Sequence, residues 1–398
     1  MKRNSTLNGL SRASSRFAKV CSLLALLLLT AQGAWAQGTI TFKEGTEDAT
    51  NWTVKSGETT VVLGETEVAK DAPVTATYSG TKHVKSVTAV VKGPEATPLT
   101  LEAITAGSIV VNNPQQDMQY TLNGGAKTAM TATTTIEVKA KDKVAFYGKG
   151  TKITSYNNTI IAGSGEGFQC KVYGNIMSLL DETGFETATK LSGNMVFNKL
   201  FSGNTTLTDA SGLLLPATTL TQNCYYQMCN GCSALTSAPA LPATTLTQDC
   251  YYQMFNDCSA LNPAPALPAT ELAKNCYRQM FNGCTALTTA PALPATTLTS
   301  YCYYKMFLGC TSLTAAPTLP ATTLVDNCYG QMFDGCTNLS SVTCLATSNI
   351  NNLGSTFNWL NSVAATGTFT AASAANWGDA SISTIPEGWT RVDYVPSN

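Results

Sequence analysis

Leu267–Ala292 reads LPATELAKNCYRQMFNGCTALTTAPA, and this 26-residue pattern occurs five times in succession. The tetrapeptide Leu-Pro-Ala-Thr begins at Leu215, Leu241, Leu267, Leu293 and Leu319. Two columns of cysteines keep the same period: Cys224, Cys250, Cys276, Cys302 and Cys328, then Cys232, Cys258, Cys284, Cys310 and Cys336. A fixed period of this length indicates a repeat architecture, because a single copy cannot bury its inward face without its neighbours.

Each copy begins with a segment in which apolar residues follow a helical spacing. In the first copy Leu220, Cys224 and Met228 fall at i, i+4 and i+8, which predicts a short amphipathic helix. Thr219 or Thr221 can cap its start. A left-handed residue is expected to end the helix, because each copy has a Gly or the tolerant Asp at that point: Gly231, Asp257, Gly283, Gly309 and Gly335.

The rest of each copy predicts one extended segment. Leu235, Ala238 and Ala240 have the L-x-x-L-x-L spacing of a leucine-rich-repeat strand. Proline removes a backbone donor from this segment in four copies, so the sheet is expected to be short or interrupted: Pro239, Pro265, Pro291 and Pro317.

These elements predict an α+β fold, a right-handed leucine-rich-repeat solenoid of 26-residue repeats preceded by two small all-β modules. Short alternating runs such as 84–91 and 144–147, with Asn123-Gly124-Gly125 as a hairpin turn, favour the β modules. The expected domains are a signal peptide (1–36), an N-terminal β module (37–96), a second, β-sandwich-like module (97–171), a linker and N-terminal cap (172–214), the five-copy solenoid (215–344) and a C-terminal cap (345–398).

Two atypical segments are expected to close the ends of the repeats. Val196, Leu200, Phe201, Asn204 and Leu207 match the repeat columns with both cysteines replaced. After the last copy a helical cap is expected, followed by a β-rich segment over 367–395; the cap comprises Leu353, Phe357, Trp359 and Leu360.

The N-terminus predicts export. The first 37 residues carry five basic and no acidic side chains, Val20–Thr30 is a short apolar run, and Ala34-Trp35-Ala36 suits signal peptidase, with cleavage before Gln37. Removing this segment leaves 19 basic against 25 acidic residues, a net charge of −6. No later run is apolar enough to span a membrane, and the mildly acidic balance argues against a nucleic-acid partner.

The residue types leave little room for catalysis. His83 is the single histidine, in a strand-like stretch, and is interpreted as a surface residue rather than a general base. No paired-carboxylate, phosphate-loop or dinucleotide motif is present. We therefore expect no enzyme activity, no catalytic residue, no cofactor and no metal site.

Ten of the fourteen cysteines lie in the two repeat columns. Their spacing of eight, without histidine, argues against zinc. Two interpretations stay open: a ladder of buried thiols that act as small hydrophobic groups, and disulfides between neighbouring copies of the second column, about 5 Å apart if they flank paired strands. A redox role for the C-x2-C pair Cys229 and Cys232 is a weaker alternative.

The candidate partner-binding residues lie on the outward positions of the repeats. The extended segments place an uncharged strip at Thr236, Ser237, Asn262, Thr288, Thr289 and Thr314. Tyr226, Tyr252 and Tyr304 share a variable column with Arg278 and Gly330 and are expected to be exposed, whereas the tyrosine that follows each first-column cysteine is expected in the core. Such an uncharged surface favours a neutral partner and weak salt dependence.

The unit Cys-Tyr-x-x-Met-Phe-x-Gly-Cys-x-x-Leu, as in Cys276–Leu287, resembles the BspA-like leucine-rich repeats of bacterial surface proteins, with Met280 in place of an alanine. The resemblance covers about 196–363, and Ile385–Trp389 is similar to the family's usual ending. It implies adhesion to host, matrix or bacterial proteins. We expect a secreted, cell-surface or periplasmic monomer that binds a protein through its strand face; the alternatives are a glycan-binding surface protein and a structural spacer without a ligand.

Overall fold

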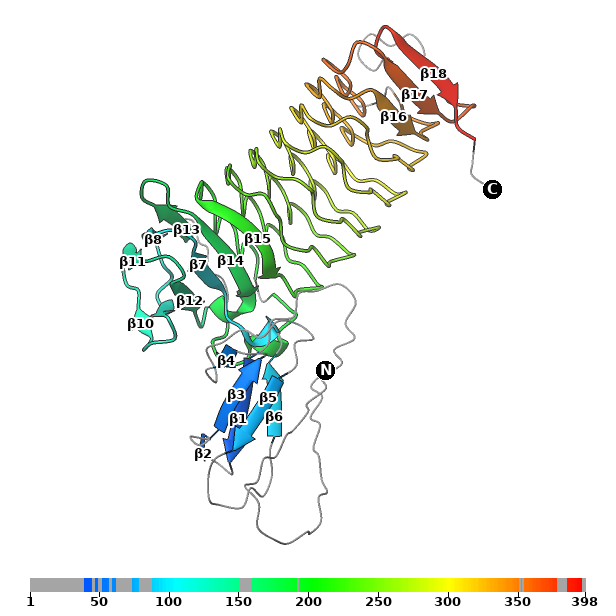
Figure 1. Cartoon of the computed structure of the whole chain (residues 1–398). Coiled ribbons are helices and arrows are strands. Elements are labelled where there is room, and N and C mark those ends of the chain that lie inside the picture. Colours follow the sequence, from blue (N-terminus) through cyan, green and yellow to red (C-terminus); the bar gives the residue numbers. More distant parts are fainter. Residues whose placement is uncertain are drawn as a thin grey trace. The chain divides into compact units, whose positions relative to one another are not determined.

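The computed structural model describes residues 94–150, 159–191, 193–350, 352, 354–377 and 385–395, and the backbone of six strands between Thr39 and Lys92 (Figure 1). The predicted signal peptide (1–36) and His83 lie outside these residues. Contacts divide the chain between Thr97 and Pro98 into two units, which are described separately below.

The first unit contains two antiparallel sheets of three strands each. One has the order β2-β1-β6 and the other the order β4-β3-β5. The strands are β1 (Thr39–Glu44), β2 (Glu47–Asp48), β3 (Trp52–Ser56), β4 (Thr59–Val61), β5 (Val74–Tyr78) and β6 (Thr88–Lys92).

The second unit opens with two sheets that share a core. One has the order β10-β9-β12-β7-β14-β15 and the other β11-β8-β13. Alternate residues of strands such as β12 are buried, as period-two side-chain geometry requires. The strands are β7 (Thr100–Ala103), β8 (Gly107–Asn112), β9 (Gln119–Leu122), β10 (Thr128–Ala129), β11 (Thr134–Val138), β12 (Lys143–Tyr147), β13 (Ile160–Ser164), β14 (Cys170–Asn175) and β15 (Leu207–Leu214). The short 3-10 helices of this unit are η2 (Ile176–Leu179) and η3 (Phe185–Thr187); η1 (Pro94–Ala96) belongs to the first unit.

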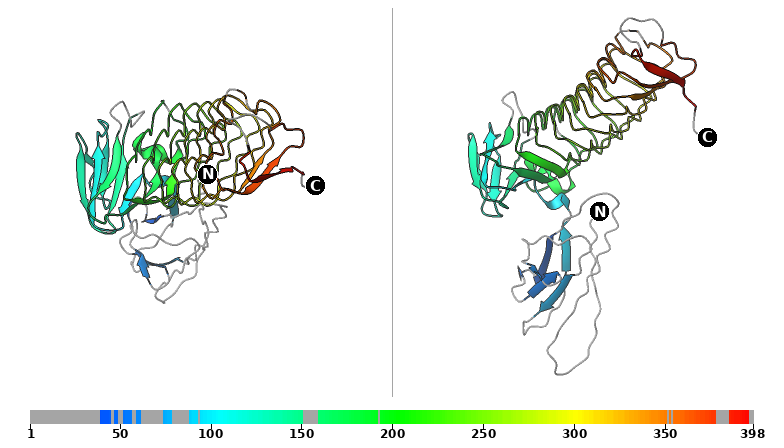
Figure 2. Two further views of the ribbon diagram at one scale, coloured as in Figure 1. Left: turned by 90° about the horizontal axis from the view of Figure 1, so that it is seen from above. Right: turned by 45° about the horizontal axis from the view of Figure 1, so that its top comes forward.

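The five copies follow β15 as consecutive loops, each lying beside the next (Figures 1 and 2). We call residues 215–340 the repeat stack. Its backbone hydrogen bonds alternate. Between Asn223 and Gly231 of the first copy every second N–H donates to the next copy, as in Tyr225 N to Cys250 O at 3.0 Å and Gln227 N to Tyr252 O at 2.8 Å. The N–H groups between them donate three residues back within their own copy, as in Tyr226 N to Asn223 O at 3.3 Å.

This alternation requires a left-handed residue every four positions. In the first copy Asn223, Gln227 and Gly231 have φ values of +57°, +53° and +74°. The left-handed residue predicted at the end of the segment is confirmed, with φ of +58° at Asp257 and +71° to +75° at the glycines. Each such residue turns the chain and prevents the i to i−4 bonding of an α-helix.

The predicted fold class, an α+β leucine-rich-repeat solenoid, is therefore wrong. The described residues contain no α-helix, only three short 3-10 segments and several small sheets, and none of these sheets runs through the repeats. The i, i+4, i+8 spacing that predicted a helix also fits successive four-residue turns, which place the same side chains inward. The predicted helical cap is likewise made of turns at Phe357, Trp359 and Leu360, and Leu353 is outside the described residues.

The extended segments also differ from the expected strand pattern. In the first copy Pro239 is buried and Ala240 is exposed, whereas Ala240 was expected inward. Backbone pairing between copies is reduced to a few bonds, such as Asn262 N to Thr236 O at 3.2 Å, because proline lacks the donor that a ladder needs. A continuous ladder returns only at the C-terminal end, in the parallel sheet of β16 (Ser341–Cys344), β17 (Gly367–Ala371) and β18 (Trp389–Asp393).

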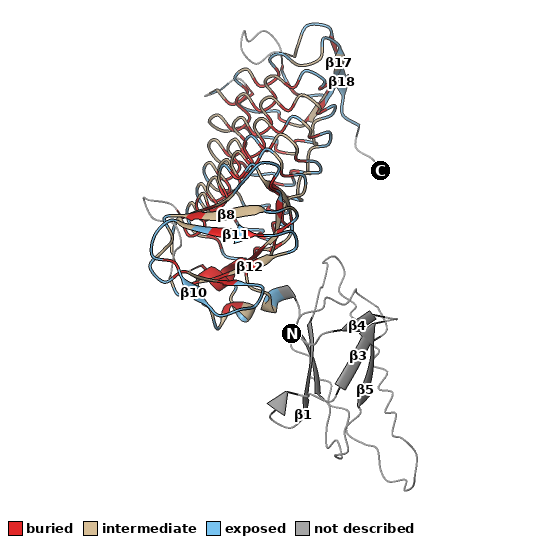
Figure 3. Ribbon diagram, turned by 60° about the vertical axis from the view of Figure 1, so that its left-hand side comes forward, coloured by how far each residue is buried: buried red, intermediate tan, exposed pale blue. Residues whose placement is uncertain are grey.

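Buried residues recur from copy to copy in the repeats (Figure 3), and aromatic side chains of equivalent positions stack. The tyrosines that follow the first-column cysteines are at most 1% exposed, which confirms their predicted place in the core, and consecutive rings lie 5.7 to 6.0 Å apart. The stack continues at 6.3 Å to Trp359, which packs against Phe369 and Trp377 at the C-terminal end.

Replacing a left-handed glycine should destabilise the stack without altering its contacts. Gly309 has φ of +71°, and no heavy atom lies within 4 Å of a Cβ built there. We expect Gly309→Ala to lower the free energy of unfolding by about 1 kcal/mol, the cost of a left-handed alanine. Urea unfolding followed by near-UV circular dichroism measures the change.

Ser312→Ala, at a position of negative φ in the same copy, is the matched control and should change stability by less than about 0.5 kcal/mol. Equal midpoints for Gly309→Ala and the unmodified protein would contradict the left-handed turn.

Candidate functional site

The outward residues of the extended segments form the first candidate surface. We call Thr236, Ser237, Asn262, Thr288, Thr289 and Thr314 the threonine strip. All are exposed except Ser237, which is half-buried. Hydrogen bonds run along it: Thr236 Oγ1 of the first copy donates to Thr208 O of β15 at 2.9 Å, and Thr288 Oγ1 donates to Asn262 Oδ1 of the preceding copy at 3.3 Å. The strip is therefore an ordered, uncharged surface.

The second candidate surface is the variable column that contains Tyr226, Tyr252, Arg278, Tyr304 and Gly330. We call it the tyrosine column. Its three tyrosines are half-buried rather than fully exposed as predicted. Tyr226 and Tyr252 stack with ring centroids 4.8 Å apart and an interplanar angle of 12°. Burial and the neighbouring Tyr252 raise the pKa of Tyr226.

Arg278 is the residue of this column that sequence reasoning passed over. Its guanidinium carbon lies 5.4 Å from the ring centroid of Tyr252, 5.0 Å from that of Tyr304 and 5.3 Å from that of Tyr301. Such distances favour cation–π attraction. The sequence signal was a single cation between tyrosines in a column that otherwise carries no charge.

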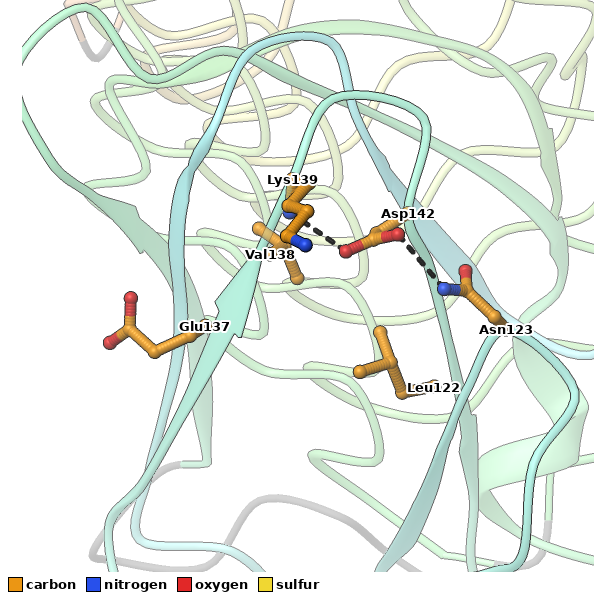
Figure 4. Close-up of a pocket in the computed structure, with 6 residues that line it drawn as sticks. All are labelled: Leu122, Asn123, Glu137, Val138, Lys139 and Asp142. Atoms are coloured by element: carbon orange, nitrogen blue, oxygen red, sulfur yellow. Dashed lines mark hydrogen bonds between the residues drawn. The ribbon is translucent and has the colours of Figure 1, made fainter.

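A hollow of about 510 Å³ lies on the β-sheet part of the second unit (Figure 4). The lining carboxylate of Asp142 accepts from Asn123 Nδ2 at 2.8 Å and from Lys139 N at 2.7 Å. These two hydrogen bonds hold the pKa of Asp142 below its usual value. Asp142 therefore fixes the turn between β11 and β12, and its oxygens are committed to structure rather than to a ligand.

A second charged cluster lies on the same β-sheet part. Glu182 accepts from Lys127 Nζ at 2.6 Å and from Lys149 Nζ at 2.9 Å, and these bonds lower the pKa of Glu182. Lys127 Nζ also lies 4.3 Å from the ring centroid of Tyr147. The charges of this cluster are paired with one another, which leaves no free general acid or base within it.

The thirteen cysteines that the structure describes are all buried and unpaired; Cys21 lies outside the described residues. Second-column thiols donate to a backbone carbonyl of the preceding copy, for example Cys284 Sγ to Phe255 O at 3.2 Å. This geometry favours the buried-thiol interpretation over disulfides between copies. Cys229 and Cys232, the C-x2-C pair, are likewise buried.

Within the described ranges, no group of three His, Cys, Asp or Glu side chains is placed to hold a metal ion. None of the helical segments in the same ranges has the length and apolar character of a membrane-spanning helix.

Comparison of the chain with protein-family models, with curated proteins and with solved structures found no match.

Buried thiols should not react with a water-soluble thiol reagent in the native protein. We expect a Cys21→Ser variant to leave a water-soluble disulfide reagent unreacted under native conditions, because access to the sulfur controls this chemistry. In denaturant without reductant, thirteen thiols should react. A shortfall of an even number of thiols would show disulfides and contradict the buried-thiol interpretation.

The same thiols should make stability fall at alkaline pH. Burial raises the pKa of Cys170 to about 11 and the pKa of Cys224 and Cys276 to about 12, from 9.0. Unfolding above pH 9 then releases protons, so the stabilisation is complete below pH 9 and is lost as the pH rises towards 12. Urea midpoints between pH 7 and 10.5 should decline above pH 9, and Cys276→Ala should make the decline shallower. A midpoint that rises with pH would contradict this linkage.

Proposed function

We propose that this chain is a non-enzymatic recognition protein that binds a protein partner through the threonine strip. The observation that carries the proposal is that successive copies hold one column of exposed, uncharged side chains in fixed register. Thr236, Asn262, Thr288 and Thr314 repeat at this position, and their spacing is set by the hydrogen bonds between copies.

The surroundings of the threonine strip support a protein-sized interface. A stable interface covers about 800 Å² on each partner, more than these six side chains supply. The exposed residues Pro263, Ala266 and Ala292 extend the same segments. The resulting surface combines hydroxyl and amide groups with apolar methyl and pyrrolidine groups, a mixture typical of protein interfaces.

The burial of the thiols and the hydrogen bonding of the carboxylates support a binding role over an enzymatic one. In the described part of the chain the thiols are buried, and the carboxylates of Asp142 and Glu182 are engaged in hydrogen bonds or ion pairs. Export by way of the signal peptide and a cell-surface or periplasmic location belong to the same proposal. They are supported by the N-terminal sequence and by the repeat's resemblance to BspA-like surface proteins.

Lysines placed on the strip should abolish binding. An array of purified matrix, host-surface and bacterial-surface proteins would be probed with the full chain and with a Thr288→Lys/Thr289→Lys variant. We expect the hits of the unmodified protein to be lost in this variant, because two unpaired charges would be buried in the interface. Binding of the unmodified protein should change less than about threefold between 0.05 and 0.5 M salt, since no ion pairs drive it.

Thr296→Lys/Thr297→Lys is the matched control, because these two threonines are equally exposed but lie on another segment, in the copy that begins at Leu293. Its hits should equal those of the unmodified protein. Hits that survive Thr288→Lys/Thr289→Lys would show that the strip is not the site, and an array without hits would favour a structural spacer.

A further inference from the structure

Arg278 carries a positive charge that the described residues leave unpaired. Its side chain makes no ion pair or hydrogen bond with them, and its Nε is buried without a partner. Asp249, the carboxylate that acts electrostatically on Tyr226 together with Arg278, accepts instead from Gln248 Nε2 at 2.9 Å. A half-buried guanidinium without a carboxylate partner keeps donors that an anionic ligand can engage.

The aromatic rings beside Arg278 are held in fixed orientations. Tyr252 donates its hydroxyl to Gln279 Oε1 at 3.1 Å, and Tyr304 donates to Gln331 Oε1 at 3.0 Å. The Tyr304 ring also packs against Gly330, where an added Cβ would lie 3.0 Å from the Cδ2 atom of Tyr304. The guanidinium therefore lies beside positioned rings from the copies before and after it, Tyr252 and Tyr304.

Four residues after the tyrosine column, each of the first three copies places an asparagine in a hydrogen-bonded row, of which Asn256 is buried and Asn230 and Asn282 are half-buried. Asn282 Nδ2 donates to Asn256 Oδ1 at 2.6 Å, and Asn256 Nδ2 donates to Asn230 Oδ1 at 2.8 Å. Lys305 adds a second cation, with Nζ 5.3 Å from the ring centroid of Tyr304. Amides and phenols offer donors and acceptors to neutral hydroxyl groups, and the two cations favour one negative charge among them.

We propose that the tyrosine column binds a carboxylate-bearing saccharide, with the uronate carboxylate on Arg278. The planar guanidinium matches a carboxylate through two parallel N–H···O bonds. The sugar hydroxyls meet the phenol and amide groups of the neighbouring copies. This site is separate from the threonine strip, and its occupation does not depend on the protein partner proposed above.

The test uses the full chain with tetragalacturonate and with its methyl ester, which keeps the sugar rings but removes the charge. Isothermal titration calorimetry should show binding of the acid that is at least about tenfold tighter than binding of the ester, the usual contribution of a charge-assisted contact. Oligomers of mannuronate and glucuronate extend the panel to other sugar geometries.

Arg278→Tyr is the decisive variant, because the column itself carries tyrosine in three other copies and should accept it without unfolding. We expect it to bind acid and ester equally weakly, with an unchanged melting temperature. Arg278→Lys, which keeps the charge but not the planar pair of donors, should fall between them. Lys274→Gln removes an exposed cation from the same copy and should bind as the unmodified protein does.

Several results would overturn the proposal. They are the absence of binding to every uronate in the panel, equal affinity for acid and ester, and an equal loss in Lys274→Gln and Arg278→Tyr. Preferential binding of an acidic peptide would assign the site to protein instead. The Thr288→Lys/Thr289→Lys variant should retain uronate binding, which separates a failure at this site from a failure at the threonine strip.

Discussion

The backbone hydrogen bond from every second residue of the turn segment Asn223–Gly231, and of its equivalents, to the next copy is the interaction on which the repeat stack depends. It fixes the copies in register, so that each side chain packs against the side chain at the equivalent position of the next copy. It also forces the intervening N–H groups to bond three residues back, which in turn requires the left-handed residues at Asn223, Gln227 and Gly231 and their equivalents. The junction between the last copy and the C-terminal cap shows that this register is kept even where the spacing changes. Gln331 N donates to Phe357 O, one residue beyond the regular spacing, and the inserted residue is absorbed in the turn while Trp359 continues the aromatic stack.

Stacking of identical residues determines what the core can be made of. A side chain that repeats must be able to pack against itself, which planar rings do at 5.7 to 6.0 Å and small thiols do without a cavity. The arrangement has a cost, because the hydroxyls of Tyr225, Tyr303 and Tyr329 are buried without hydrogen-bond partners, and each such group opposes folding. The ring contacts and the apolar area buried by each copy must offset it.

The sequence was sufficient to predict the repeat, its core columns, its left-handed glycines and the strands at its C-terminal end, because all of these follow from residue types at a fixed period. The helix could not be excluded by spacing alone, since four-residue turns and helices both place Leu220, Cys224 and Met228 on one side. Asn223, Asp249, Asn275 and Asn327 at the left-handed positions were the available sign against it. The unpaired state of Arg278 could not be predicted, because it depends on which carboxylates from other copies reach the guanidinium.

The division between inward and outward positions explains where this chain can carry specificity. Inward side chains are constrained by their own copies above and below, so they vary little along the stack. Outward side chains also link some copies, as Thr288 does to Asn262, but the backbone keeps the register, and the repeats differ at these outward positions: Arg278 and Gly330 interrupt a column of tyrosines, and Asn262 interrupts a row of threonines. A substitution at these places changes the surface without disturbing the register beneath it. Differences between copies at outward positions are therefore the part of the sequence that the backbone register does not require, and both proposed binding surfaces lie there.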